Sequence, residues 1–130
     1  MAAVKMPERV NEIDLDWISA VLVQRFPNSV FRSAKIADVI SGTSTKVRVN
    51  LDTETAPGCE APPATVIVKG GLEEHCEALA PLYRTEASFF RDVQPSIQLR
   101  APETYFVHVD EVGHHSIVIM EDLRARGVEF

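Results

Sequence analysis

The chain has 130 residues, enough for one compact domain with a hydrophobic core and too few for two domains of ordinary size. Hydrophobic residues make up 45% and charged residues 25%, and the formal net charge of −6 argues against binding to nucleic acid. No apolar run is long enough to cross a bilayer, and the first residues lack a secretory signal. Cys59 and Cys76 are too few for a disulfide framework or a zinc site. We therefore expect a cytoplasmic domain without a membrane partner.

The first predicted element is a helix over residues 14–26. Asp14 can cap this helix, because its carboxylate can accept a backbone N–H from the first turn, and Ile13 and Ile18 can pack as a hydrophobic staple. The apolar residues at helical spacing are Trp17, Ile18, Val21, Leu22 and Phe26. Pro27 ends the run. This apolar face must cover some other part of the fold.

Five strands and a second helix are predicted after it. In chain order these are strands over 35–40, 46–52 and 65–69, a helix over 79–93, and strands over 104–109 and 116–120. Val47, Val49 and Leu51 alternate with polar residues, which is typical of a half-buried antiparallel strand. The polar turn 41–45 makes a hairpin of the first two strands, and the loop 53–63 is rich in proline. The pattern predicts an α+β fold with a five-stranded antiparallel sheet, an inserted helix and an N-terminal helix.

The second predicted helix carries a carboxylate within its apolar stripe. Glu86 falls at steps of three and four among Leu79, Leu82, Tyr83, Phe89, Phe90 and Val93. A buried glutamate is costly unless it is paired, so either Glu86 reaches water at the edge of the stripe or a cation lies on the sheet beside it. The candidate cation is Lys69, which shares a strand face with Thr65 and Ile67; the alternative is that Lys69 is a solvated strand end.

The hairpin turn is a candidate anion contact. It consists of Ser41, Gly42, Thr43, Ser44 and Thr45. Backbone N–H groups of small residues can approach an anion closely, and hydroxyl groups can donate hydrogen bonds to it. One glycine is a weak signal, since plain turns have the same composition, and the Gly-Lys-Ser/Thr ending of a P-loop does not occur.

The order of these motifs resembles the N-terminal lobe of the protein-kinase-like fold. A glycine-containing hairpin, a Val-Ile-Val-Lys strand, a helix with an inward Glu and two further strands lead to the Met-Glu-Asp-Leu segment 120–123. The closer resemblance is to the aminoglycoside phosphotransferase and choline kinase-like family, above all its ecdysteroid-kinase-like branch, and it covers about residues 34–130. It divides the chain into an N-terminal extension and helix over about 1–33, sheet and helix over 34–123, and the hinge and start of a second lobe over 121–130.

The resemblance implies an ATP-dependent phosphotransferase that transfers the γ-phosphoryl group to a hydroxyl of a small-molecule acceptor. It implies that Lys69 contacts the α- and β-phosphates of ATP, that Glu86 orients Lys69, and that the turn 41–45 covers the phosphates. The acceptor itself is not indicated, because the family selects it mostly through the second lobe.

The resemblance also implies an adenine site at the hinge. Ile67 would roof the adenine and Met120 would border the back of its pocket, while the Glu121 carbonyl and the Leu123 N–H would hydrogen-bond its edge. The family's catalytic and magnesium-binding aspartates belong to the second lobe. We therefore expect no catalytic residue, no metal ligand and no turnover from these 130 residues alone, and self-association where the cleft surface is exposed.

Two other hypotheses stay open. A non-catalytic binding domain derived from a kinase lobe could dock a partner on its hinge and cleft; a stop codon directly after Phe130 would favour it, and a downstream His-x-Asp motif would favour the kinase. In an unrelated α+β domain, Lys69 and Glu86 would lie apart and solvated. A metal cluster of His108, His114 and His115 is not favoured, because strand alternation separates their side chains.

Overall fold

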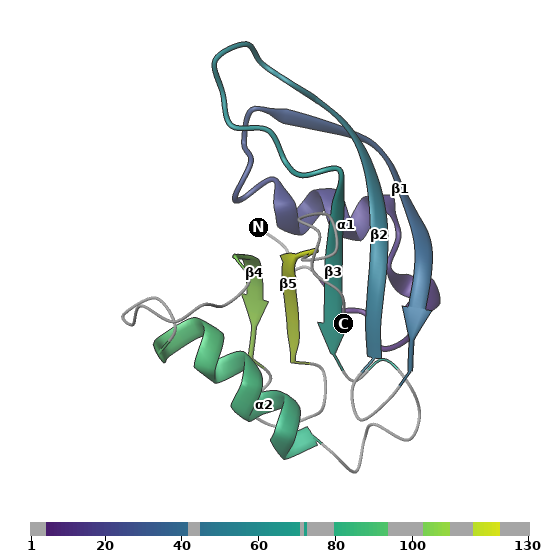
Figure 1. Cartoon of the computed structure of the whole chain (residues 1–130), viewed down its shortest axis with the longest axis vertical. Helices are drawn as coiled ribbons and strands as arrows, with labels where there is room; N and C mark the ends of the chain where they lie inside the picture. Colours follow the sequence, from purple (N-terminus) through teal and green to yellow (C-terminus); the bar gives the residue numbers. More distant parts are fainter. Residues whose placement is uncertain are drawn as a thin grey trace.

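The computed structural model describes residues 5–41, 45–70, 72, 80–93, 103–109 and 116–122. The elements in these ranges are η1 (Val10–Glu12), α1 (Leu15–Leu22), β1 (Ser29–Ile40), β2 (Thr45–Thr55), β3 (Thr65–Gly70), α2 (Ala80–Ser88) with a π-helical turn over Phe89–Val93, β4 (Thr104–His108) and β5 (Ile117–Glu121) (Figure 1). The strands form one antiparallel sheet in the order β1-β2-β3-β5-β4. The predicted α+β class and five-stranded antiparallel sheet are confirmed.

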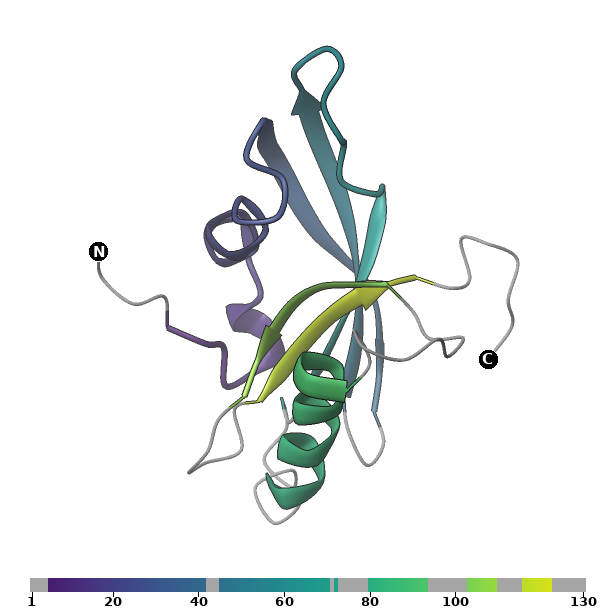
Figure 2. The same cartoon turned by 90° about the vertical axis from the view of Figure 1, so that its left-hand side faces the viewer.

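The helix α1 covers one face of the sheet (Figures 1 and 2). Its N-terminus is capped as predicted, since the Asp14 carboxylate accepts a hydrogen bond of 2.9 Å from the Trp17 backbone N–H. The buried residues of this core are Ile13, Trp17, Ile18, Val21, Leu22, Phe26, Val47, Val49, Val66, Val68, Leu72, Ile117 and Ile119. Because helix and strand residues share this core, α1 is an integral part of the domain.

The helix α2 lies on the opposite face of the sheet, against β4 and β5 (Figure 2). Ala87 and Phe90 are buried there with Ile67, Val118 and Met120. These strand residues alternate along β3 and β5 with those that face α1, as the two-residue period of a strand requires. A second, smaller core therefore fixes α2 to the sheet.

Three predicted boundaries in the first half are wrong. The helix predicted over 14–26 ends at Leu22, although a 2.9 Å bond from the Phe26 N–H to the Leu22 carbonyl continues the winding as a turn and keeps Phe26 buried. The strand predicted over 35–40 begins at Ser29, because Ser29 still pairs with Thr55 of β2. The loop predicted over 53–63 accordingly starts only after β2 ends.

The predicted second helix changes its winding. It is α-helical only to Ser88, and the π-helical turn that follows has more residues per turn, which breaks the spacing of three and four. Ala87, which the predicted stripe omits, is buried at 1% exposure. The side chains of Leu79, Leu82, Tyr83 and Val93 lie outside the described part of the structure.

Candidate functional site

The register of four strands places two rows of side chains on the sheet face that carries α2, which we call the site face. Residues directly opposite each other in antiparallel strands share a face. The first row is Asp38, Arg48, Ile67 and Met120 across β1, β2, β3 and β5. The second row is Ile40, Lys46, Lys69 and Val118. The second row lies nearer the β1–β2 turn, so the predicted lysine and the predicted turn share one corner of the sheet.

Lys69 and Glu86 form the ion pair that the sequence predicts. The Lys69 Nζ lies 2.6 Å from Glu86 Oε1, and the two side chains are 22% and 32% exposed. The distance is that of a charge-assisted hydrogen bond. The two groups are not far apart, so the observation that would favour an unrelated α+β domain is not made. Because the ammonium is fixed but not sealed from solvent, it can still meet an anion.

Local structure in α2 aims Glu86 at the sheet. Pro81 stands in the first turn of the helix, where a missing N–H costs no helical hydrogen bond. Ala87 and Phe90 then anchor the helix on Ile67 and its neighbours. Glu86 precedes the buried Ala87 and reaches the exposed rim of this contact, where a carboxylate can contact Lys69 and water together.

A second lysine lies directly across from Lys69. Lys46 of β2 pairs in register with Lys69 of β3, and both side chains are partly buried. Like charges directly opposite on a sheet repel each other, and Glu86 supplies one negative charge at this corner. Two lysines therefore meet at this corner of the sheet, a feature that the sequence analysis missed.

Of the remaining predicted site residues that the structure describes, Ile67 and Met120 belong to the rows of the site face, whereas Thr45 and Glu121 do not. Ile67 and Met120 are direct neighbours across β3 and β5, but they are only 6% and 8% exposed, so they offer a base little free surface. Glu121 ends β5. Ser41 is exposed beside the turn, whereas Thr45 is fully buried opposite Gly70. Gly42, Thr43, Ser44 and Leu123 lie outside the described residues.

The strongest feature that sequence reasoning missed is a charge cluster around Arg48 of the first row, in which Asp122 is buried and Asp38 is half exposed. Alternation predicted Arg48 on the polar side of β2, yet its side chain is 9% exposed and its Nε donates to Asp122 Oδ2 at 2.8 Å. Asp122 is 4% exposed. Asp38 of β1 accepts from Arg48 Nη1 at 3.2 Å. The available signal was an arginine between two valines that face the core, which places a charge in the middle of the sheet.

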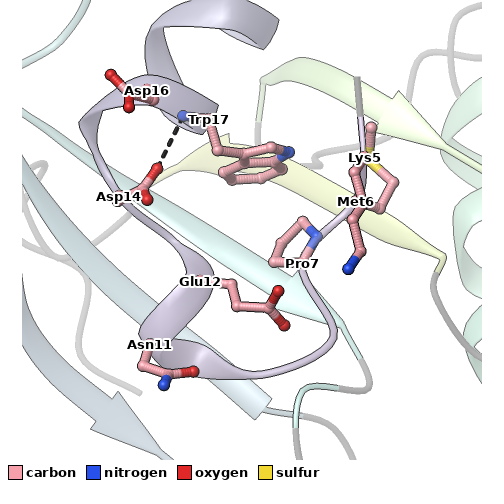
Figure 3. A pocket seen from close by; sticks show the side chains of 8 residues that line it. All are labelled: Lys5, Met6, Pro7, Asn11, Glu12, Asp14, Asp16 and Trp17. Carbon is pink, nitrogen blue, oxygen red and sulfur yellow. Dashed lines mark hydrogen bonds between the residues drawn. The ribbon is translucent and has the colours of Figure 1, made fainter. Parts of the chain in front are cut away.

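A separate cavity of about 400 Å³ lies on the other side of the molecule, beside the start of α1 (Figure 3). It is lined by Lys5, Met6, Pro7, Asn11, Glu12, Asp14, Asp16 and Trp17. Two of its carboxylates already accept hydrogen bonds from the backbone: Asp14 caps α1, and Glu12 accepts from the N–H groups of residues 8 and 9. The Trp17 Nε1 has no hydrogen-bond partner but is closed off from solvent, so a ligand in the cavity could not reach it.

Other candidate groups are dispersed in the part of the chain that the structure describes. Within those residues no group of three or more His, Cys, Asp or Glu side chains could hold a metal ion. His108 is half-buried in β4, and His114 and His115 lie outside the described ranges. Cys59 is an exposed free thiol. No helix among the described residues is long and apolar enough to span a membrane.

Comparison of the chain with models of protein families, with curated proteins and with solved structures found no match.

Proposed function

We propose that this chain is the nucleotide-binding lobe of an ATP-dependent small-molecule phosphotransferase, which transfers the γ-phosphoryl group to an acceptor hydroxyl. The observation that carries the proposal is the 2.6 Å ion pair between Lys69 of β3 and Glu86 of α2. Phosphotransferases of the kinase type need this pairing of a strand lysine and a helix glutamate to hold ATP. The order of hairpin, strand, helix and hinge segment around the pair supports the same function.

In this proposal Lys69 acts as a fixed charge for the phosphates. Its ammonium has three N–H donors, and the bond to Glu86 uses one of them. The other donors can meet oxygens of the α- and β-phosphates. Glu86 holds the side chain in place before the nucleotide arrives, which reduces the entropy lost on binding. Lys46, directly opposite, adds a second positive charge at the same corner.

The described residues do not fit a magnesium site. Among the described residues, the carboxylates that lie on the two rows or bond to them are Asp38, Glu86 and Asp122, and each of them is in an ion pair with Arg48 or Lys69. Mg²⁺ that accompanies ATP needs carboxylate oxygens that are not already held by such cations. No step through a metal ion is therefore assigned to these residues.

The proposal is tested by binding of ATP to the full-length gene product, measured by calorimetry. Lys69→Ala removes a charge-assisted contact and should weaken ATP binding by about 10- to 100-fold. Glu86→Gln keeps the shape of the side chain but not its charge, so it should weaken binding less than Lys69→Ala does. Phosphoryl transfer to a panel of hydroxyl compounds should fall in the same order.

A matched control is Lys5→Ala, which removes an exposed lysine on the α1 side of the sheet. It should leave ATP binding unchanged. ATP affinity that is equal in the parent protein and in Lys69→Ala would refute the assigned role. No ATP binding by the parent protein would refute the proposed function itself.

A further inference from the structure

The Arg48–Asp122 pair bridges two strands that are not neighbours. Arg48 lies in the middle of β2, Asp122 directly follows β5, and β3 runs between them. The 2.8 Å bond from Arg48 Nε to Asp122 Oδ2 therefore crosses over β3 on the site face. With Asp38 on β1, one guanidinium group connects the edge strand, β2 and the chain beyond β5.

Stability alone is a poor reason for such a pair. The two side chains are 9% and 4% exposed, so both charges have lost most of their water. Desolvation of a buried ion pair offsets much of its attraction, and apolar residues of similar volume often stabilise a fold as well or better. What a buried arginine provides in addition is a defined geometry, because its planar group bonds to its partners in fixed directions.

Asp122 lies where the fixed geometry of Arg48 can position the end of β5. The pairing of β3 with β5 ends at Val66 and Glu121, so Asp122 is the first residue beyond the ladder. The bond to Arg48 continues the attachment of the chain to the sheet past that point. In the proposed function the carbonyl of Glu121, directly before Asp122, accepts a hydrogen bond from the adenine edge.

We propose that Arg48 is a positioning residue for the base, an inference that rests on the proposed function. Through Asp122 it holds the end of β5 at a fixed place relative to Lys69, which belongs to the neighbouring row on the same face. The base end and the phosphate end of the nucleotide site are thereby kept at one distance. Arg48 acts on recognition of the base and not on the phosphates.

The test compares two ligands, ATP and inorganic tripolyphosphate, by calorimetry on the full-length gene product. Arg48→Met should weaken ATP binding about tenfold, roughly the contribution of one hydrogen bond, and leave tripolyphosphate affinity within about twofold. Asp122→Asn keeps an acceptor for Arg48 Nε and should lose less ATP affinity than Arg48→Met. Lys69→Ala should weaken the binding of both ligands. Unfolding followed by circular dichroism shows that each variant is folded.

The control is Arg32→Met, which breaks an exposed ion pair with Glu54 on the same hairpin. It should change neither affinity. If Arg48→Met and Asp122→Asn weaken the binding of ATP and of tripolyphosphate equally, or change the binding of neither ligand, the positioning role is overturned while the proposed function stands. If the parent protein binds neither ligand, or if Lys69→Ala binds both with the affinity of the parent protein, the proposed function is refuted. The positioning role of Arg48 is then refuted as well.

Discussion

The substitution Leu22→Ala tests whether α1 is a structural part of the lobe. Leu22 is fully buried at the end of α1, and the adjacent Val23 is 42% exposed. Removing a fully buried leucine side chain costs about 2.7–5 kcal/mol, because transfer energy is lost and a cavity stays behind. The whole stability of a domain is about 5–15 kcal/mol, so the loss is a large share of it. Val23→Ala removes two methyl groups from a partly exposed side chain and should cost far less than Leu22→Ala, about 0.5 kcal/mol.

Two spectroscopic probes separate an integral helix from an attached one. Trp17 is the single tryptophan of the chain; it is buried in α1, with its ring 6.4 Å from that of Phe106 on β4. Its fluorescence therefore reports on the docking of α1, and far-ultraviolet circular dichroism reports on the sheet. In urea, Leu22→Ala should lower both midpoints together. A fluorescence midpoint that falls while the dichroism midpoint stays at the parent value would refute the reasoning and make α1 an appendage.

Two further predictions concern the packing of β3 and the pH dependence of stability. At Gly70 a Cβ atom would lie 3.0 Å from the Ser116 carbonyl oxygen, so Gly70→Ala should cost about 1–3 kcal/mol in urea unfolding. The comparison is Gly58→Ala, whose Cβ atom would meet no atom within 4 Å; it tests backbone strain alone, because Gly58 has a φ of 80°. If Gly70→Ala binds ATP as tightly as the parent protein does, β3 absorbs the clash without moving Lys69. Burial, followed by the charge of Glu103, raises the pKa of Tyr105 from 10.0 to about 12. The folded state thus holds this proton more tightly than the unfolded state, and stability should fall as the pH rises from about 10 to 12 in the parent but less in Tyr105→Phe; parallel pH profiles of the two proteins would contradict this.

The sheet was predictable because its signals are local and consistent. Alternation of Val47, Val49 and Leu51 with polar residues fixes which side of β2 faces the core, and the adjacent turn makes the pairing with β1 the nearest available one. The Lys69–Glu86 pair was predictable for another reason. A carboxylate within an apolar helical stripe requires a partner, and a lysine at the end of the preceding strand is the nearest candidate in the chain.

What the sequence could not indicate depends on which strands become neighbours. The alternation that places Arg48 on the face opposite Val47 and Val49 gives no reason for its burial, because nothing local reveals that Asp122 lies across β3 from it. The contact joins residues 74 positions apart, and it exists only in the strand order with β5 beside β3. The extension of β1 back to Ser29 has the same origin, since its partner Thr55 lies in a segment that reads locally as the start of a loop.

The two faces of the sheet differ in their side chains: one carries the large apolar core and the other carries the ion pairs. Val66 and Val68 face α1 and are fully buried, whereas Ile67 and Lys69, between and beside them, face the other way. A large apolar core on one face supplies most of the hydrophobic stabilisation. The other face can then hold charges whose net contribution to stability is small. This division explains why an ion pair that remains partly open to solvent lies at the end of a strand that is otherwise buried. If the proposed function holds, substitutions under α1 should change stability with little effect on the affinity of the folded protein for ATP.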